Sequence, residues 1–113
     1  AHGGGAFPGL IGRLEHGFNV QPDIVATAND RNPREYLGQF YVDSLVHEPD
    51  MLNYMIDLFG SNRIALGSDY PFPLGEHHPG EMIEAMHLDD KTRSDLLADS
   101  AFEWLALNRK NFE

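Results

Sequence analysis

Two short apolar segments with a helix between them constrain the fold of this chain most strongly. Residues 39–46 are rich in β-branched and aromatic side chains, which favours a strand. Residues 64–67, Ile-Ala-Leu-Gly, form a short apolar run that is typical of a buried parallel strand. The segment between them has one apolar face at helical spacing, formed by Leu52, Met55, Ile56 and Phe59. This strand–helix–strand order predicts a parallel α/β arrangement, although two strands are too few for a complete parallel sheet.

Further helices are predicted on both sides of this unit. The first covers residues 7–18, where Pro8 suits the first turn and apolar side chains recur every four residues. Residues 19–34 are polar and irregular and predict a loop, which is followed by a short helical turn at 34–37. Three more helices are predicted towards the C-terminus, at residues 81–87, 91–98 and 101–107.

Polar residues at the predicted helix ends indicate where the helices begin. Asp50 is a suitable N-cap for the helix between the two strands, and Gly60 would end that helix. Asp89 is the predicted N-cap of the next-to-last helix, and Asp99 or Ser100 is the predicted N-cap of the last one. The large apolar residues of these helices are predicted to pack in the core: Met51, Met55, Met82, Met86, Trp104, Leu105 and Leu107.

Length and composition limit the classes of protein to consider. The 113 residues form a single segment, whereas a complete βα-barrel needs about 250 residues. A formal net charge of −10 argues against nucleic acid or an anionic membrane as the main partner. The chain has no cysteine, which excludes disulfides and thiolate metal sites. No apolar run approaches the roughly 20 residues of a membrane span and no signal peptide is visible, so a cytoplasmic location is expected.

Asp69 is the most informative candidate for a functional residue. It follows the second apolar segment, at the C-terminal end of a predicted strand, where α/β enzymes place catalytic groups. A carboxylate in this position can bind a metal or act as a base. The alternative is a structural role as the cap of a turn or of the next helix, and the pattern alone does not separate the two.

Several other residues could take part in chemistry, each with a structural alternative. His2 precedes three glycines, which would leave room for a ligand beside the imidazole, although an incidental terminal histidine is the commoner explanation. Arg13 could bind a carboxylate through two N–H groups, and a surface ion pair is the alternative. His47 stands at the end of the first strand segment. The adjacent pair His77 and His78 is expected on a solvated loop, because neighbours in an extended segment point apart.

Motifs of phosphate binding, serine hydrolysis and complete metal sites are absent from the sequence. No glycine-rich run is followed by Lys-Ser or Lys-Thr, and no Gly-x-Ser-x-Gly segment occurs. No His-x-His or His-Glu-x-x-His motif occurs either. The chain therefore carries no complete metal-binding motif of its own.

Several segments resemble decarboxylases of the amidohydrolase superfamily. They are Ala1-His2-Gly3-Gly4-Gly5-Ala6-Phe7-Pro8, Gly12-Arg13, His16-Gly17-Phe18, Tyr36-Leu37-Gly38, Phe40-Tyr41, Asp43, Leu45-Val46-His47 and residues 66–76. The Gly-Ser-Asp-Tyr-Pro-Phe-Pro segment at 67–73 resembles one group in particular, which acts on an intermediate of tryptophan and kynurenine catabolism. The resemblance extends over nearly the whole chain, and it implies that residues 1–113 are the C-terminal part of a (β/α)8 barrel.

The resemblance also implies chemistry with one divalent metal, usually zinc, and a small carboxylated substrate. Members of the group remove a carboxylate without redox chemistry. By this resemblance, Asp69 corresponds to the metal-binding aspartate at the end of the last barrel strand, and His2 to a histidine that acts as acid and base. Arg13 corresponds to an arginine that reaches into the neighbouring subunit's site and holds a substrate carboxylate, and Phe72 to an aromatic residue that lines the pocket.

The sequence departs from the family pattern by lacking its N-terminal half. A His-x-His pair, another metal-binding histidine and a second substrate arginine are missing with it. Because zinc sites normally need at least three protein ligands, the isolated chain is expected to bind zinc weakly and to lack decarboxylase activity. A partial barrel leaves sheet edges open, so we expect a homodimer or association with a complementary N-terminal half.

Two alternatives remain open at this point. The chain could belong to a related amidohydrolase-type hydrolase or decarboxylase that acts on another carboxylated substrate, and residues upstream of Ala1 would then choose that substrate. It could instead be a non-catalytic assembly fragment, which would form no metal site even when combined with an N-terminal half.

Overall fold

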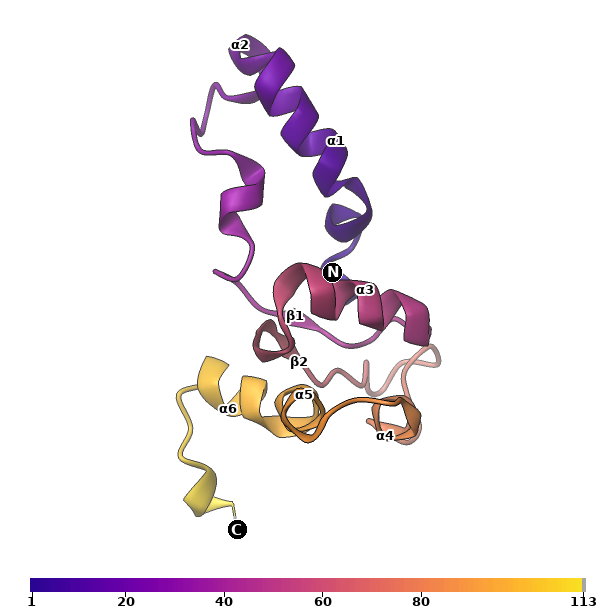
Figure 1. The fold of residues 1–113 in the computed structure, drawn as a ribbon. Helices are drawn as coiled ribbons and strands as arrows, with labels where there is room; N and C mark the ends of the chain where they lie inside the picture. The colour runs from indigo at the N-terminus through magenta and orange to yellow at the C-terminus, as the bar shows by residue number, and fades with distance from the viewer. Residues whose placement is uncertain (113) are drawn as a thin grey trace.

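The computed structural model describes residues 1–112 as an elongated molecule with principal extents of 51 × 29 × 29 Å (Figure 1). Its elements in chain order are the 3-10 helix η1 (His2–Gly4), α1 (Phe7–Val20), α2 (Pro22–Val25), η2 (Pro33–Tyr36), β1 (Val42–Asp43), α3 (Pro49–Phe59), η3 (Ser61–Arg63), β2 (Ile64–Ala65), α4 (Glu81–Ala85), α5 (Asp90–Ser94), the π-helix η4 (Asp95–Asp99), α6 (Ser100–Trp104) and η5 (Arg109–Asn111). We call residues 7–36 the arm and residues 42–104 the body. Figure 1 shows the arm projecting from the body, with α1 and η2 side by side.

The two strands lie side by side in parallel, with Val42 opposite Ile64. The predicted parallel α/β order is therefore confirmed. Each strand is only two residues long, however, and thus shorter than the predicted segments 39–46 and 64–67. Within the described residues each strand pairs with only one other strand. Hydrogen bonds to a single neighbour hold only a short stretch of backbone in the extended conformation.

Helix α3 supplies the apolar face that builds the core. The predicted face is confirmed, since Leu52 and Met55 are fully buried and Phe59 is nearly so. Side chains from β2, α4 and η4 complete the buried cluster, whose members are Leu52, Met55, Phe59, Ile64, Ile83 and Leu96. Burial of each such side chain contributes roughly 1.5–3 kcal/mol, so this cluster is the main source of stability in the body.

Helix α3 begins before the residue that the sequence indicates as its cap. Glu48, not Asp50, is the N-cap, with an extended backbone and a side chain that accepts the Asp50 N–H at 3.4 Å. Pro49 explains the earlier start, because its fixed φ suits the first helical position. Asp50 lies in the first turn, where its charge faces the positive end of the helix dipole. Gly60 ends the helix as predicted, with a φ of 88°.

The helices from α5 to α6 form one continuous run instead of two capped helices. The backbone stays helical at Asp99 and Ser100, so the prediction that one of them is an N-cap is wrong. The Ser100 hydroxyl instead donates to the Ser61 carbonyl at 3.0 Å. Asp89 is an N-cap as predicted, and it accepts the Thr92 N–H at 2.9 Å.

The predicted core positions divide into two groups. Met55 is buried, and the remaining methionines are partly buried against the core cluster: Met51, Met82 and Met86. The prediction that the C-terminal residues pack in the core is wrong. Trp104 is 60% exposed, and Leu105 and Leu107 are exposed as well. The Trp104 ring contacts Tyr41, with 6.2 Å between ring centroids, but no described element covers its outer side.

The arm is more helical than its sequence indicates. Helix α2 falls inside the predicted loop 19–34, where Pro22 starts it at a position that needs no N–H donor. Aromatic rings join the arm to the body. Phe7 stacks on Phe59 of α3 with 6.3 Å between ring centroids, and it meets Phe40, which precedes the body, edge-to-face at 5.7 Å. The arm also leaves many apolar side chains exposed: Leu10, Leu14, Val20, Ile24 and Val25.

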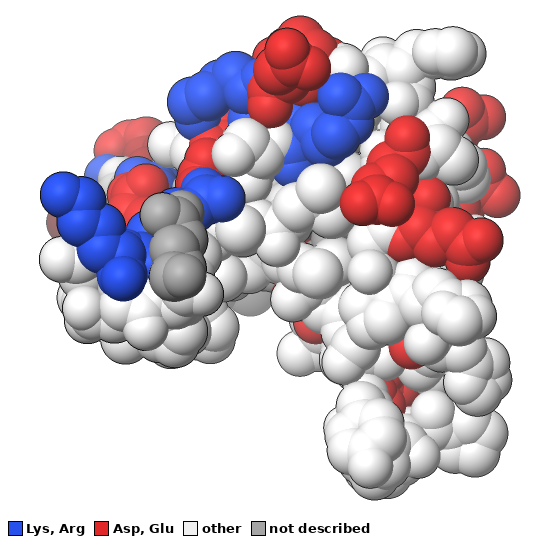
Figure 2. Space-filling view, turned by 90° about the horizontal axis from the view of Figure 1, so that it is seen from below, with Lys and Arg blue, Asp and Glu red and all other residues white. Residues whose placement is uncertain are grey.

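The molecular surface carries charges of both signs. Figure 2 shows Lys and Arg intermingled with Asp and Glu on one part of this face, beside a broad area where few charged side chains are seen. Among residues 1–112, no helix has both the length and the apolar character that crossing a membrane requires. The longest helix, α1, has 14 residues.

Candidate active site

Three polar side chains from distant parts of the chain meet beyond the carboxyl ends of the two strands. His2 Nδ1 lies 2.6 Å from Asp43 Oδ2, and His2 Nε2 lies 2.9 Å from Asp69 Oδ1. Asp43 ends β1, and Asp69 follows shortly after β2. Parallel strands bring their carboxyl ends to the same edge of a sheet, which is where α/β proteins place their functional groups. The imidazole is therefore held between two carboxylates.

The glycines after His2 allow this approach. Gly3 has a φ of 58°, in the left-handed region that glycine adopts without steric cost. A Cβ atom at Gly3 would lie only 2.5 Å from Val46 Cγ1. Because Gly3 has none, its backbone N–H reaches Asp43 Oδ1 at 2.8 Å. The glycine therefore sets the position of His2 against the end of β1.

The carboxylate of Asp43 is fixed by backbone on several sides. Oδ1 accepts two N–H groups, from Gly3 at 2.8 Å and from Leu45 at 3.2 Å. Gly67, which follows β2, lies against the same side chain, and a Cβ there would stand 2.9 Å from Asp43 Cβ. These contacts leave Oδ2 for the histidine.

Asp69 lies in a tightly bonded loop between β2 and α4. Its φ of 55° is unusual and costly for a residue other than glycine. The Phe72 N–H donates to the Asp69 carbonyl at 2.8 Å, and the Glu76 N–H donates to the Ser68 carbonyl at 2.9 Å. Gly75 packs inside the loop, since a Cβ there would lie 2.5 Å from the Ser68 carbonyl oxygen. The loop therefore holds the Asp69 side chain, which is 18% exposed, towards His2.

The two carboxylates raise the pKa of His2 above its ordinary value of 6.5. The hydrogen bond to Asp43 is the largest cause, the hydrogen bond to Asp69 is next, and the negative charges add to both. Partial desolvation opposes this effect but does not cancel it. The site thus favours a protonated imidazole, which can donate a proton from a defined place.

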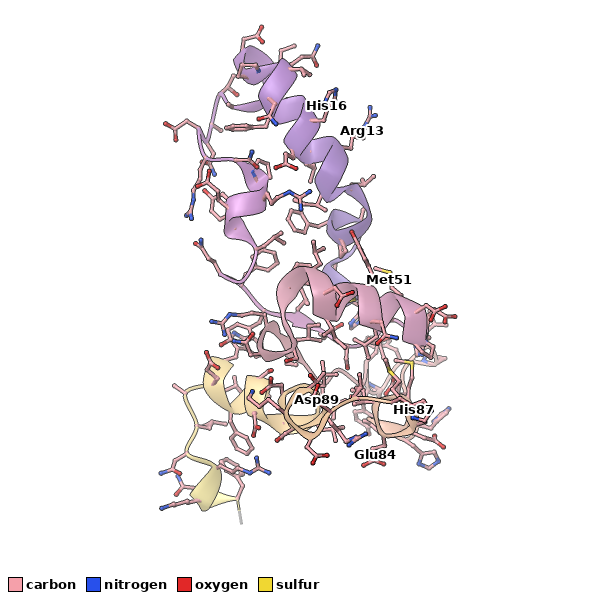
Figure 3. The ribbon with its side chains drawn as sticks, viewed as in Figure 1. Arg13, His16, Met51, Glu84, His87 and Asp89 are labelled. Atoms are coloured by element: carbon pink, nitrogen blue, oxygen red, sulfur yellow. The ribbon has the colours of Figure 1, made fainter. Side chains whose placement is uncertain are left out.

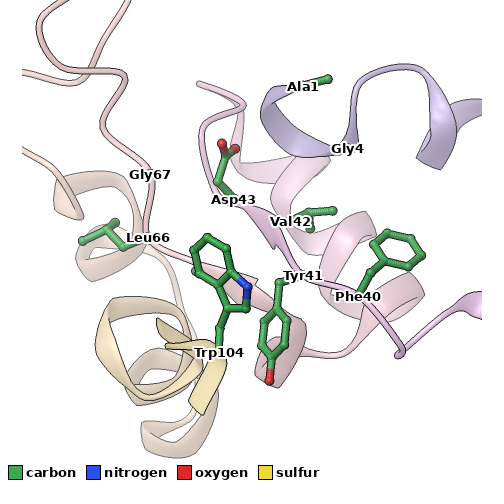
Figure 4. Close-up of a pocket in the computed structure, with 10 residues that line it drawn as sticks. Ala1, Gly4, Phe40, Tyr41, Val42, Asp43, Leu66, Gly67 and Trp104 are labelled. Atoms are coloured by element: carbon green, nitrogen blue, oxygen red, sulfur yellow. The ribbon is translucent and has the colours of Figure 1, made fainter. Parts of the chain in front are cut away.

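A cavity of about 510 Å³ adjoins this site. Asp43 lines it together with residues after β2, such as Gly67, and with Tyr41 and Trp104 (Figure 4). Its volume is in the range of small-molecule sites, which is roughly 300–1,000 Å³. We call Asp43, His2 and Asp69 the carboxylate–histidine–carboxylate group. A small ligand in this cavity would lie beside its Asp43 end.

The structure brings together two of the four residues that the sequence predicts for the site. His2 and Asp69 are in contact, whereas Arg13 lies on α1 in the arm, away from the strands (Figure 3). Phe72 is 65% exposed in the loop after Asp69. The exposed positions of Arg13 and Phe72 leave both free to contact groups from outside this chain.

Asp43 is a site residue that the sequence pattern did not single out. The signal was present, because Asp43 is the one charged residue within the predicted strand segment 39–46. Its role depends on a partner 41 positions away in sequence, and no local pattern reveals such a partner.

The other histidine candidates do not join the site. His47, His77 and His78 are exposed and surround a separate hollow with Glu76 and other residues. The predicted solvated loop for the pair at 77–78 agrees with their exposure.

A complete metal site is not formed by this part of the protein. Across residues 1–112, no group of three or more His, Asp or Glu side chains is arranged to hold a metal ion. Asp69 is a suitable single oxygen ligand for zinc, but a stable site needs three or more. Its carboxylate also bonds His2. The residues described here do not by themselves fit a resident zinc ion.

Two curated relatives match this chain along almost its whole length. A protein of Dictyostelium discoideum named 2-amino-3-carboxymuconate-6-semialdehyde decarboxylase is 50% identical over 113 residues, covering 99% of this chain and 32% of the relative. A protein of Caenorhabditis elegans with the same name is 43% identical over 109 residues, covering 96% of this chain and 27% of the relative. The chain thus spans 27–32% of the length of these relatives, and the predicted resemblance is confirmed.

Two solved structures share the fold of this segment. The Metarhizium anisopliae IDCase, in apo form, aligns with a TM-score of 0.73 at 24% identity, over 93% of this chain and 32% of that one. A dihydroxybenzoic acid decarboxylase from Polaromonas sp. JS666, solved with bound manganese and the inhibitor 2-nitroresorcinol, aligns with a TM-score of 0.73 at 20% identity, over 96% of this chain and 33% of that one. At these identities the likeness concerns the fold, and in each case this chain corresponds to one part of a larger structure.

The sequence profile of the amidohydrolase family matches nearly the entire chain, from residue 1 to residue 107. The match includes both strands and every residue of the carboxylate–histidine–carboxylate group. Together with the similarity to the curated relatives, it shows that this chain belongs to the amidohydrolase family.

Proposed function

We propose that this chain supplies the C-terminal part of the active site of a metal-dependent, non-oxidative decarboxylase. The proposed substrate is 2-amino-3-carboxymuconate-6-semialdehyde, after the names of the two curated relatives. The observation that carries the proposal is the position of His2 between Asp43 and Asp69 at the carboxyl ends of the strands. We expect the enzyme to be cytoplasmic.

The proposed role of His2 is proton transfer to the substrate. Its ring is hydrogen-bonded at both nitrogens, and the raised pKa favours the protonated form. His2 would donate this proton from Nε2 to the unsaturated carbon that carries the carboxylate. When the carbon–carbon bond to that carboxylate breaks, its electron pair restores the double bond and carbon dioxide leaves. The added proton thus replaces the lost carboxylate.

Asp69 has two proposed tasks. One oxygen bonds His2 Nε2, and this bond orients the ring. We propose that the carboxylate is also one ligand of a divalent metal, expected to be zinc, which would supply Lewis-acid chemistry once the remaining ligands come from the longer protein. The low exposure of Asp69 supports a role inside an assembled site.

Arg13 is proposed to hold a substrate carboxylate in the site of a neighbouring subunit. It has no ion-pair partner among residues 1–112, and it projects from α1 in the arm (Figure 3). The same helix exposes Leu10, Leu14 and Val20, an apolar surface that a second subunit or the N-terminal part of the protein could cover. Phe72 is proposed to line the substrate pocket of the assembled enzyme.

The test compares the complete protein, including the residues encoded upstream of Ala1, with the isolated chain. We expect the complete protein with metal to release carbon dioxide from the substrate and the isolated chain to show no turnover. His2→Asn and Asp69→Asn in the complete protein are each expected to lower kcat by at least about 100-fold. His87→Asn is a matched control, since His87 is exposed at the end of α4 (Figure 3).

Three outcomes would count against the proposal. Turnover by the isolated chain would show that the site does not need the upstream residues. Activity of the complete protein on a different carboxylated substrate alone would point to the related enzyme class. A complete protein with no metal and no activity would favour the non-catalytic assembly fragment.

A further inference from the structure

We infer that Asp43 is the positioning residue of this site: its carboxylate holds the His2 ring at Nδ1, so that Nε2 is the nitrogen presented to Asp69 and the substrate. The inference rests on the proposed function, because it concerns how the proton-transferring histidine is oriented. It adds a second carboxylate to a site for which the sequence predicts only Asp69.

The first support is the rigidity of the Asp43 carboxylate. Its Oδ1 atom accepts two backbone N–H groups, from Gly3 and Leu45, which come from different segments of the chain. Gly67 closes the other side, at a spacing that admits no Cβ atom. A carboxylate bonded in this way cannot rotate without losing both backbone bonds, so its Oδ2 atom occupies a defined place.

The second support is the direction of the bond to His2. An ionised carboxylate only accepts hydrogen bonds, so the hydrogen in the 2.6 Å contact between His2 Nδ1 and Asp43 Oδ2 belongs to the imidazole. Asp69 accepts in the same way at Nε2, so the protonated ring carries a hydrogen on both nitrogens. The contact to Asp69 is longer and the Asp43 carboxylate is fixed by two backbone N–H groups, so the hydrogen on Nδ1 is retained and Nε2 is the nitrogen that gives up and regains a proton. Nε2 is also the atom that faces Asp69 at 2.9 Å. Asp43 thus selects both the orientation and the tautomer of the ring.

The third support is the coupling between His2 and Asp43 through the backbone. The N–H of Gly3 bonds the same carboxylate as the preceding ring. The main chain and the side chain of this segment therefore both bond Asp43, which places the histidine relative to β1. Such outer partners of a reactive histidine commonly affect activity by 10–100-fold.

Asp43→Asn is the decisive substitution, because it keeps the shape and one oxygen. The oxygen of the new side chain can still accept the two backbone N–H groups, while the amide nitrogen faces His2 and can only donate. The ring must then accept at Nδ1 and carry its hydrogen on Nε2, which is the wrong tautomer for proton transfer. We expect kcat of the complete protein to fall by about 100-fold or more with KM within about twofold.

A spectroscopic readout separates positioning from a merely structural role. The ring nitrogen shifts of His2 in the 113-residue chain, measured by 15N–1H correlation where the ring is neutral, should change from the Nδ1–H to the Nε2–H form in Asp43→Asn. Asp57→Asn is the matched control, since Asp57 is an exposed aspartate of α3. It should leave kcat, KM and the ring shifts unchanged. Thermal unfolding of each variant checks that the fold is retained.

The outcomes distinguish this inference from the proposed function. If the complete wild-type protein has no decarboxylase activity, the proposed function fails, while the ring shifts still decide whether Asp43 holds His2. If the wild-type protein is active and Asp43→Asn keeps kcat within about threefold, the positioning role is overturned. An unchanged tautomer of His2 in Asp43→Asn would overturn it too. So would a variant whose main defects are a raised KM and a lowered Tm, because these would indicate a merely structural role.

Discussion

The arm and the body of this molecule use similar apolar residues in different ways. In the body, the core residues Leu52, Met55 and Ile64 are fully buried by elements of the same chain. In the arm, Pro8 and Ile11 are the residues of α1 that are buried, while apolar side chains such as Ile24 remain 65% exposed. The body therefore buries its core side chains within the chain, whereas the arm presents an apolar surface that another subunit or another part of the protein can cover.

The candidate site lies where these two regions meet. His2 belongs to η1, which leads directly into the arm, and the two carboxylates belong to the body. The ring of Phe7 at the start of α1 packs on Phe40 close to β1. A site built across this junction depends on both regions keeping their relative position, so the difference between them can be tested by substitutions placed in pairs.

The largest expected difference in stability is between two leucine substitutions, one in each region. Leu52→Ala removes a fully buried side chain and should lower the free energy of unfolding by about 2–5 kcal/mol. Leu14→Ala in the arm, where the side chain is 38% exposed, should cost less than about 1 kcal/mol. Urea unfolding of both variants measures the difference. Equal losses would show that the arm packs as tightly as the body.

Substitution of two glycines by alanine should change the stability in opposite directions. Gly3→Ala puts a Cβ at a φ of 58° and against Val46, so we expect a loss of about 1–3 kcal/mol. Gly9→Ala in α1 meets no atom within 4 Å and should stabilise the helix by up to about 1 kcal/mol. Thermal unfolding reports both changes. A stabilising Gly3→Ala would contradict the close contact between η1 and β1.

The smallest expected effect is a dependence of stability on pH at the junction. The raised pKa means that folded His2 binds its proton more tightly than the unfolded chain does. Its stabilisation is therefore complete below 6.5 and is lost as the pH rises through the raised pKa. Because the side chain is half exposed, the decline in Tm as the pH rises above 6.5 should be small.

His2→Gln should remove this decline. His16→Gln is the control in the arm, because His16 is an exposed histidine of α1 (Figure 3). An identical decline of Tm with pH in the wild-type chain and in His2→Gln would mean that the two carboxylates do not hold the proton on the ring.

Residues with strong local patterns were predicted correctly from the sequence. The helical spacing of Leu52, Met55 and Phe59 indicated a buried face, and it is buried. Gly60 and Asp89 ended and began helices as expected, because both act through their own backbone or the next turn. The N-cap at Asp50 failed for a local reason, since Pro49 starts the helix earlier.

The remaining errors concern interactions over long distances in the sequence. Trp104 looked like a packing residue, but only the arrangement of the whole chain shows that nothing among the described residues covers it. Strand length was also overestimated, because a strand extends only as far as its neighbour does.

The sequence by itself determined the parallel strand order and the apolar face of α3, and it singled out Asp69 as a candidate, because periodicity and strand-end position are local properties. His2 became a candidate for proton transfer through the family resemblance. Only the tertiary structure decided that Asp43 joins His2 and Asp69 and that Arg13 stays apart. The physical reason is that hydrogen bonds such as those of His2 connect residues 41 and 67 positions apart, and their geometry exists only once the strands are aligned.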